Sequence, residues 1–538
     1  MKTAAAAAIA LVAGGLATGA SGGLPAGPRL LRLSVDNGGH PYAGDRRLLT
    51  TVTPNGDGYR DRARVNFVLR RPATVKLEVV STDEVRRPQT VIMTETAHFD
   101  IGRHHMLWKP APSTPERTYI LRLTAVDDLR RRRVYGLVRP GPGHHQNAPV
   151  VRVLGIQAAF GQRSYAPNDL ASVRVRADAR SLRFQVFAYG NEAHPTERDL
   201  KTSGVAMTPP VTLDWRHHRD APQLVRFVRA GLWPSGLYFL RMTANDGRVG
   251  YAPLILRPKI MGEHKVAVVL STNTWQAYNF DDANGDGWGD SWYISGQTRR
   301  VDLSRPFLEF GVPRRFKDWD LTFVSWLATT SKHVDYLSDD DLERFRNGDA
   351  LAARYNLVVF PGHEEYVTSH VYDVITRYRD LGGNLAFLSA NNFFWKVDRH
   401  GHWLYRVHQW RNLGRPEARL CGVQYVASDR GGHMGGFVVA DTSAAPWLFD
   451  GTGLRNGDRF GNYGIEIDQR TSHSPRGTRL LATIPDLMGP GKTAEMTYYE
   501  TPNGAKVFAA GALNFASTAD VPVVSRLLEN LWARLSVP

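Results

Sequence analysis

Two stretches in the first half of the chain close on the same nine-residue pattern, Tyr-x-Leu-Arg-x-Thr-Ala-x-Asp. One copy lies in ERTYILRLTAVDD (116–128) and the other in SGLYFLRMTANDG (235–247). In both copies apolar and polar residues alternate, which is typical of a strand with one buried face. Shorter alternating runs precede each copy, and Pro, Gly and Asp separate them. The pattern predicts two Ig-like β-sandwich modules, at 29–140 and 147–258, joined by the linker RPGPGHHQNAP.

From about residue 262 the pattern changes to short, continuous apolar runs, as expected of strands buried on both faces. The runs are HKVAVVLST (264–272), DLTFVSW (320–326), YNLVVF (355–360) and NLAFLSA (384–390). Helical segments lie between the last three, among them SHVYDVITRYRDLGG (369–383) with its Gly-Gly stop. Strands that alternate with helices predict an α/β three-layer domain with a mainly parallel sheet at 262–538. The expected fold class is therefore multidomain, and a length of 538 residues allows it.

The extreme N-terminus has the composition of a targeting segment. Residues 1–23 place one Lys before a run of small apolar residues, the layout of a secretory signal peptide, so we expect a secreted, extracellular protein. No other segment approaches about 18 continuous apolar residues, so no membrane span is expected. The single cysteine, Cys421, excludes an intramolecular disulfide. The net charge of +15 is spread along the chain without interleaved aromatics, so no nucleic-acid partner is expected.

An acidic, glycine-rich phrase occurs twice, as DDANGDGWGD at 281–290 and as TPNGDGYRD at 53–61. Its spacing is that of oxygen ligands in a calcium-binding turn. In the longer copy the predicted calcium ligands are Asp282, Asn284, Asp286, the Trp288 carbonyl and Asp290. In the shorter copy they are Asn55, Asp57 and Asp61, a weaker set because Thr53 replaces the first aspartate. We interpret the longer loop as a fastening that pins the neighbouring TWQAYN segment, not as the reactive site.

Ligands of open α/β sheets bind outside the carboxyl ends of the strands, and three polar segments follow such strands here. They are NTWQAYN with Trp275 and Tyr278, PGHEEY with His363, Glu364, Glu365 and Tyr366, and NNFFW with Asn391, Asn392 and Trp395. There is no Gly-x-Ser-x-Gly elbow and no phosphate-binding loop, which leaves serine-nucleophile and nucleotide chemistry without support. Cys421 does not follow a strand of the parallel series. The remaining His, Glu and Tyr side chains suit a hard metal ion.

An ordered series of short motifs resembles the C-terminal domain of the N,N-dimethylformamidase large (beta) subunit family. The motifs are TWQAYN, RPF (305–307), VDYLSDDDL (334–342), PGHEEY, GGNLAFLSANNFFW (382–395), GIEID (464–468) and KVFAAGALNF (506–515), and the resemblance covers about 262–535. The second module is similar to the β-rich region that precedes this domain in the family. The first module resembles Ig-like modules of the flagellar hook-cap type, which carry a similar NGDG phrase.

The resemblance implies a mononuclear iron, held by two tyrosines and one glutamate, that hydrolyses a small substituted amide. Carried over by motif, the expected iron ligands are Tyr366, Glu466 and Tyr278, with Tyr336 as the reserve for the second tyrosine. His363 or Glu365 would orient or deprotonate the attacking water. Two departures from the family are the VTS that follows PGHEEY and the acidic insertion beside Tyr278.

Two functions follow as hypotheses. The first is an exported, iron-dependent amidohydrolase acting on linear amides, with a small partner subunit or oligomeric assembly as further partners. The second is a non-catalytic extracellular protein that retains the fold and binds cell-surface carbohydrate through its sandwich modules. We interpret Asn391 and Asn392 as turn residues, and Trp275 and Trp395 as pocket walls without a role in the chemistry.

Overall fold

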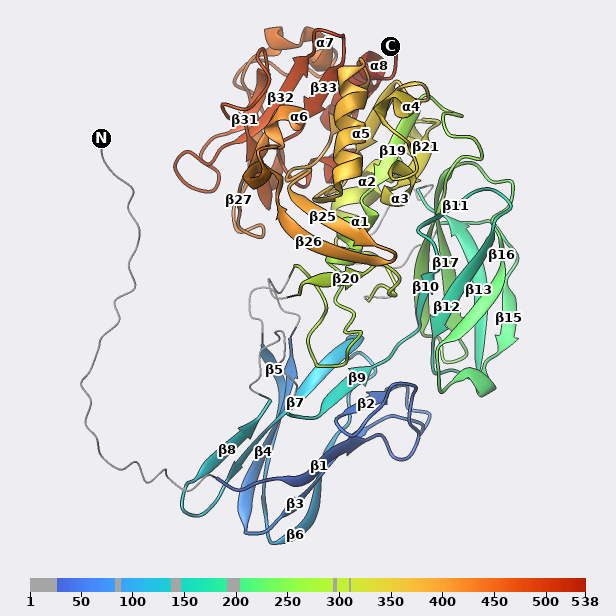
Figure 1. Cartoon of the computed structure of the whole chain (residues 1–538), viewed down its shortest axis with the longest axis vertical. Coiled ribbons are helices and arrows are strands. Elements are labelled where there is room, and N and C mark those ends of the chain that lie inside the picture. The colour runs from blue at the N-terminus through green and yellow to red at the C-terminus, as the bar shows by residue number, and fades with distance from the viewer. Residues whose placement is uncertain (1–26, 83–88, 137–146, 191–203, 294–297, 309–310) are drawn as a thin grey trace, which may run out of the picture.

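The computed structural model describes residues 27–82, 89–136, 147–190, 204–293, 298–308 and 311–538. The signal peptide predicted at 1–23 and most of the predicted linker lie outside the described residues. Figure 1 places the first module at the lower end, the second module to the right, and the C-terminal domain above both.

The first module packs two sheets face to face. The smaller sheet has the order β1-β3-β6 and the larger one β2-β9-β7-β4-β5, with β8 added to β7. Alternate residues of β3 point inward, and Val65 and Phe67 share one core with Leu77 and Leu121 of the larger sheet. The strands are β1 (Leu31–Asp36), β2 (Leu49–Val52), β3 (Ala63–Leu69), β4 (Ala73–Ser81), β5 (Thr90–Phe99), β6 (Gly102–Trp108), β7 (Arg117–Val126), β8 (Arg132–Tyr135) and β9 (Val150–Val153).

One strand crosses the boundary expected from the sequence. β9 follows the predicted linker, yet it pairs with β2 in parallel and with β7 in antiparallel orientation. The first module therefore includes residues up to Val153, and the chain enters the second module only after that strand.

The second module has the same two-sheet plan. One sheet has the order β10-β12-β16 and the other β11-β18-β17-β13-β14, with β15 added to β13. Tyr238 and Leu240 of β17 pack in its core with Trp215. The strands are β10 (Gln157–Phe160), β11 (Ser164–Tyr165), β12 (Leu170–Arg176), β13 (Ser181–Ala188), β14 (Val205–Ala206), β15 (Val211–Asp214), β16 (Gln223–Arg229), β17 (Gly236–Ala244) and β18 (Val249–Leu256), with a 3-10 turn η1 (Arg216–His218).

The C-terminal domain is built on a nine-stranded sheet of order β21-β19-β22-β24-β33-β32-β31-β28-β29. Consecutive residues of β19 belong to different cores: Val266 and Val268 face the side of α2 and α8, and Ala267 and Val269 face the side of α5. The strands are β19 (Val266–Leu270), β21 (Asp335–Ser338), β22 (Leu357–Phe360), β24 (Asn384–Phe387), β28 (Met434–Val439), β29 (Arg459–Gly464), β31 (Arg479–Ile484), β32 (Ala494–Glu500) and β33 (Lys506–Ala509).

Short helices connect and cover these strands (Figure 1). The helices are α1 (Thr272–Ala277), α2 (Thr322–Thr329), α3 (Asp339–Leu342), α4 (Gly348–Ala352), α5 (Ser369–Asp380), α6 (Ala418–Cys421), α7 (Pro446–Phe449) and α8 (Pro522–Leu535), with a π-helical turn η2 (Lys317–Leu321) and 3-10 turns η3 (Trp410–Leu413), η4 (Thr442–Ala444) and η5 (Phe515–Thr518). The helix predicted at 369–383 is confirmed: Thr368 caps its start, and Gly382 follows its end with φ +98°. None of the described helices is long and apolar enough to cross a membrane.

The predicted fold class, with its three-layer α/β domain around a mainly parallel sheet, is wrong. In the described sheet, β21, β19, β22, β24 and β33 are joined by four parallel pairings. The remaining strands add four antiparallel pairings. Strands hold 39% of the described residues and helices 16%. The parallel pattern was inferred from four apolar runs in 264–390, and one of them, 320–326, is helical and lies in η2 and α2. The later strands include the β32–β33 hairpin, and a tight hairpin joins only antiparallel strands.

Two small sheets lie beside the carboxyl ends of the parallel strands. One has the order β20-β26-β25-β23 and the other pairs β27 with β30. Their strands are β20 (Arg300–Asp302), β23 (Tyr366–Val367), β25 (Trp395–His400), β26 (Trp403–Gln409), β27 (Gln424–Ser428) and β30 (Glu466–Gln469). These sheets carry several of the side chains that form the candidate site.

Candidate functional site

Four segments meet at the carboxyl ends of the parallel strands. The loops after β19, β22 and β24 carry Tyr278, the segment 363–366 and Asn391, and Glu466 begins β30. Parallel strands end at a common edge, which brings the three loops together. β30 is held beside them because Ile467 forms a bridge with Ala512, close after β33. The segments expected from the sequence to converge thus lie in contact.

The hydroxyl groups of Tyr278 and Tyr366 share one carboxylate. Tyr278 donates a hydrogen bond to Oε2 of Glu365, and Tyr366 bonds to the same carboxylate. The two phenol rings are 6.1 Å apart between centroids. His363 Nε2 lies 3.8 Å from Glu365 Oε2 and 3.5 Å from Glu466 Oε2. Two phenols, two carboxylates and one imidazole therefore surround one small volume.

Burial controls the charges of this cluster. Burial raises the pKa of Glu365 to about 7, and burial together with the charge of Glu365 raises that of Glu466 well above its usual value. Burial and the nearby carboxylates raise the pKa of both tyrosines well above 10. Burial lowers the pKa of His363 to about 3, so its imidazole is neutral. With no cation among them, these groups favour their uncharged forms.

The donor chemistry fits a hard metal ion. Among the described residues no three His, Cys, Asp or Glu side chains are gathered closely enough to hold a metal by themselves, so a metal here would need the phenol oxygens. Tyr278, Tyr366, Glu365 and Glu466 supply oxygen donors at one place, and a cation would offset the burial of their negative forms. Neither ring nitrogen of His363 has a hydrogen-bond partner among the described residues.

Asn391 positions Glu466, a role that the sequence did not indicate. Its side-chain Nδ2 donates to Glu466 Oε2 at 2.7 Å, and its backbone N–H donates to Asp468 Oδ1 at 2.8 Å. The backbone of Asn391 is left-handed, with φ 55°. Its side-chain Oδ1 is buried without a partner. Asp468 was also missed, although its place two residues after Glu466 puts both carboxylates on one face of β30.

Aromatic rings enclose the cluster. Trp292 packs on Tyr366 with centroids 4.8 Å apart, and Trp319 packs on His363 at 5.4 Å. The Arg406 guanidinium lies over the rings of Trp292 and Trp395 and lowers the pKa of Glu365 and Tyr366 against the effect of burial. Trp292 and Trp319 were not singled out from the sequence, since nothing local marks a tryptophan as a pocket wall.

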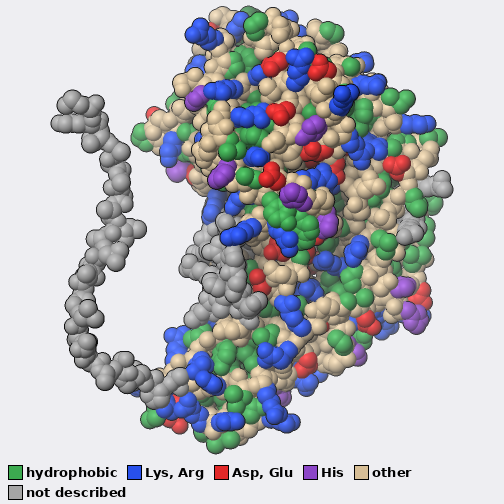
Figure 2. All heavy atoms as spheres, viewed as in Figure 1, with side chains coloured by type: hydrophobic (Ala, Val, Ile, Leu, Met, Phe, Trp, Pro, Cys, Tyr) green, Lys and Arg blue, Asp and Glu red, His purple; other side chains and the backbone are tan. Residues whose placement is uncertain are grey.

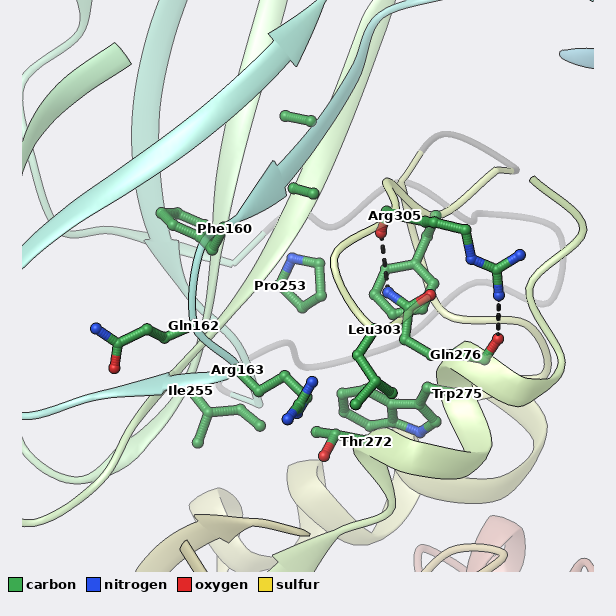
Figure 3. A pocket seen from close by; sticks show the side chains of 13 residues that line it. Phe160, Gln162, Arg163, Pro253, Ile255, Thr272, Trp275, Gln276, Leu303 and Arg305 are labelled. Atoms are coloured by element: carbon green, nitrogen blue, oxygen red, sulfur yellow. Dashed lines mark hydrogen bonds between the residues drawn. The ribbon is translucent and has the colours of Figure 1, made fainter. Parts of the chain in front are cut away.

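Two other candidates lie elsewhere. The reserve ligand Tyr336 is on β21, in a core shared with Leu237 and Phe239 of the second module. Trp275 donates from Nε1 to Asp320 Oδ2 at 3.3 Å. Its ring lines a separate cavity of about 40 Å³ between α1 and the second module, with Phe160, Arg163, Pro253, Ile255, Gln276 and Arg305 among the other lining residues (Figure 3).

Arg305 of the RPF motif fixes the segment that carries Tyr278. It donates to the carbonyl oxygen of Gln276 at 2.6 Å, and Gln276 donates back to the Arg305 carbonyl at 2.9 Å (Figure 3). It also donates to the carbonyl oxygens of Asp281 and Asp290, each at 2.9 Å. The buried guanidinium thus joins the end of α1 to both ends of the acidic loop.

The acidic loop at 281–290 is docked onto the first module. Thr118 of that module donates to Asp282 Oδ2 at 2.8 Å, and Thr82 donates to the Gly287 carbonyl oxygen. Arg46 donates to the carbonyl oxygens of Asn284 and Gly285, at 2.9 and 3.1 Å. Trp288 packs with Ile120 and Val80 in a small core. The loop therefore fastens the C-terminal domain to a module more than 150 residues away in sequence.

The carboxylates of this loop are buried close together and repel one another. Burial and the neighbouring aspartates Asp286 and Asp290 raise the pKa of Asp282 to about 7. Burial raises the pKa of Asp290 to about 6, partly offset by Arg305. Asp282 also accepts hydrogen bonds from the backbone N–H groups of Gly285 and Gly287. A divalent cation would relieve the repulsion between these carboxylates.

The shorter copy contacts the second module, and one of its carboxylates is paired with an arginine there. Asp57 pairs with Arg219 of the second module at 2.7 Å, and Asn55 donates to Asp246 at 3.0 Å. Asp61 accepts hydrogen bonds from the backbone N–H groups of Gly56 and Gly58. The same phrase thus serves here as a junction between the two modules.

Comparison with known proteins finds one matching family model and two related proteins. The family model described as "N,N-dimethylformamidase beta subunit-like, C-terminal" matches residues 211–526. The N,N-dimethylformamidase beta subunit of Paracoccus aminophilus is 26% identical over 254 residues, which covers 36% of this chain and 33% of the relative. The beta subunit from Alcaligenes sp is 25% identical with the same coverage. The chain thus aligns with about a third of the length of these relatives.

The comparison with solved structures finds low overall similarity. An α2-macroglobulin from Escherichia coli matches 43% of this chain and 17% of its own length, at 12% identity and a TM-score of 0.22.

Proposed function

Because the chain belongs to the N,N-dimethylformamidase beta subunit-like family, we propose that it is a metal-dependent hydrolase of small linear amides. The family match begins at residue 211, inside the second module, and includes every residue of the cluster described above. The observation that carries the proposal is the sharing of the Glu365 carboxylate by two buried phenols, with Glu466 close by. Such a group of oxygen donors is costly to bury unless a cation or protons neutralise it.

We propose iron as the metal, held by Tyr278, Tyr366 and Glu466, with Glu365 completing the oxygen set. Iron bound there would act as a Lewis acid toward the amide carbonyl oxygen. The phenols would bind it as phenolates, because the metal charge replaces the protons that they now share with Glu365. The aromatic rings packed around the cluster would exclude bulk water from a bound amide.

The chain's own residues would orient the reacting molecules. His363 is neutral and neither of its ring nitrogens has a partner among the described residues, so it would orient a water molecule through one nitrogen. Glu365, whose pKa burial raises to about 7, would accept the proton as that water attacks the carbonyl carbon and would return it to the amine nitrogen as the C–N bond breaks. Asn391 Oδ1, buried without a partner, would accept a hydrogen bond from an amide N–H or from the leaving amine. Asn391 Nδ2 keeps Glu466 in place during the reaction.

Metal analysis of the purified protein tests this proposal. We expect about one iron per chain and a visible absorption band, because phenolate-to-iron charge transfer absorbs in the visible range. Tyr278→Phe and Tyr366→Phe should each lose the band, and separate Glu365→Gln and Glu466→Gln variants report which carboxylate the metal needs. Tyr336→Phe is the matched control, since Tyr336 is buried but lies in another core. A folded protein that binds no iron would overturn the proposal and favour the non-catalytic alternative.

Calcium at the longer acidic loop is a separate proposal. Asp282, Asn284, Asp286 and Asp290, with the Trp288 carbonyl, would bind it, and the mutual repulsion of the carboxylates supports the choice of a divalent cation. We do not extend the calcium proposal to the shorter copy, because Arg219 already neutralises Asp57.

We also propose that the protein is exported, because its N-terminal segment has the composition of a signal peptide. We propose assembly with a partner subunit, because the relatives are named as beta subunits.

A further inference from the structure

One end of the first module presents unpaired positive charge together with exposed apolar side chains. The turns at 70–72, 100–101 and 127–131 all lie at this end, because β3 pairs with β6 at Leu69 and Gly102, and β4 pairs with β7 at Thr74 and Val126. The start of β1 reaches the same end through the pairing of Leu31 with Val68. We call this surface the basic tip; it comprises Arg29, Arg32, Arg70, Arg103, Arg130, Arg132, Ile101 and Leu129.

The positive charge of the basic tip exceeds the negative charge of the acids around it. Its six arginines are exposed, and among the described residues none of their guanidinium groups takes part in an ion pair. Two exposed aspartates lie nearby, Asp100 and Asp128. The third acid of this end, Asp127, is buried and already pairs with Arg131 and Arg71. Figure 2 shows Lys and Arg side chains distributed over this lower end of the molecule.

Two large apolar side chains project among these arginines. Leu129 is 72% exposed and Ile101 is 65% exposed, and each stands in a turn beyond the ends of the strands. Ile101 follows β5 and Leu129 follows β7, and β4 lies between these two strands in the sheet. Since neighbouring strands lie about 4.8 Å apart, the two turns are within roughly 10 to 15 Å of each other. Apolar side chains at the outermost points of a surface contribute little to its fold, and they are available to a partner.

The opposite end of the module is occupied. Leu49, Ile120 and Val150 lie there against the acidic loop of the C-terminal domain. The basic tip therefore faces away from the rest of the protein, at the lower extremity in Figure 1. A flat partner could approach it without contact with the other domains.

We infer that the basic tip docks the protein onto an anionic lipid surface, with Leu129 and Ile101 entering the headgroup layer and the arginines binding phosphate groups. Arginine forks match phosphate oxygens, and basic residues near an anionic bilayer each strengthen binding by about fivefold. A soluble polyanion would use the arginines but not the apolar pair, so exposure of Leu129 and Ile101 favours a bilayer. The inference is independent of the proposed amide hydrolysis, because the candidate site lies in a different domain.

Vesicle sedimentation with the whole protein tests the inference. We expect binding to phosphatidylcholine vesicles that contain about one third phosphatidylglycerol, no binding to phosphatidylcholine alone, and loss of binding at high salt. The triple variant Arg70→Gln, Arg103→Gln, Arg130→Gln should bind at least about tenfold more weakly. The double variant Leu129→Ser, Ile101→Ser should weaken binding roughly tenfold without loss of thermal stability.

A matched control separates the tip from general positive charge. Arg455, Arg459 and Arg476 are exposed arginines of the C-terminal domain, and their replacement by Gln removes the same charge elsewhere. The control triple variant should bind vesicles like the wild type. Equal losses in the two triple variants would overturn the inference, as would absence of vesicle binding. It would also be overturned if Leu129→Ser, Ile101→Ser left vesicle binding intact while inorganic polyphosphate competed fully, because the partner would then be a soluble polyanion.

Discussion

Tyr278 donates its phenol proton to Oε2 of Glu365, although 87 positions separate the two residues in sequence. The contact joins the loop after β19 to the loop after β22, and Tyr366 approaches the same carboxylate. The rings of both tyrosines pack in a small core with Trp292 and Trp319, while their hydroxyls point at polar atoms.

Removal of the Tyr278 hydroxyl should abolish amide hydrolysis while the ring still packs. We expect Tyr278→Phe to lower kcat/KM for N,N-dimethylformamide or a related formamide by at least about 100-fold, because an oxygen donor is lost from the cluster. Release of the amine is the measurement. Tyr336→Phe should keep wild-type rates; if both variants behave alike, Tyr278 has no special role.

Two replacements of Asn391 should distinguish the role of its side chain from that of its left-handed backbone. Asn391→Gly tolerates the left-handed φ of 55° but loses the hydrogen bond to Glu466, so we expect kcat to fall about 10- to 100-fold with little change in stability. Asn391→Ala should add a backbone strain of about 1 kcal/mol, seen as a lower unfolding midpoint. Full activity in Asn391→Gly would return Asn391 to the role of a turn residue.

Calcium should stabilise the protein through the longer acidic loop. For a dissociation constant of roughly 0.1 to 1 mM, calcium at about 10 mM would add about 1.4 to 2.7 kcal/mol to the free energy of unfolding. Calorimetry with calcium and with a chelator measures the shift. Asp286→Ala should remove the calcium dependence, whereas Asp57→Ala should lower the melting temperature equally in both conditions, because it breaks an ion pair with Arg219.

Stability should fall as the pH rises from about 4 to about 7, in part because of Asp320. This side chain is 1% exposed, and burial raises its pKa to about 7 from 3.8. Since the folded pKa is the higher one, the folded state binds the extra proton, and the stability is complete below about pH 4 and is lost up to about pH 7. Asp320→Asn should therefore exceed the wild type in stability above pH 7, by an amount that grows by up to about 1.4 kcal/mol per pH unit between these limits. Urea unfolding across this range tests it, with the exposed Asp520→Asn as control.

Local features were predicted from the sequence better than strand directions and the contacts between distant segments. The family resemblance carried by TWQAYN, PGHEEY and GIEID is confirmed, and the helix at 369–383 is confirmed, because capping residues and motif order are local signals. The mainly parallel sheet predicted for the C-terminal domain was wrong, since apolar runs encode burial but not strand direction, and four antiparallel pairings join its later strands.

Only some residues of the candidate site could be predicted from the sequence. Tyr278, the segment 363–366 and Glu466 were singled out, and they lie together. Asn391 was interpreted as a turn residue, because its contact with Glu466 depends on a β30 that is 75 residues away. The docking of the acidic loop on Thr118 could not be derived, since it depends on how separate domains pack.

The position of β9 has a consequence for how the protein is cut into fragments. A first module that ends before Val150 would leave the backbone of β2 and β7 without the strand that lies between them. Two such open edges are templates for association with other chains, so this fragment should aggregate. A fragment that extends past Val153 keeps the sheet continuous from β2 to β5 and should remain monomeric.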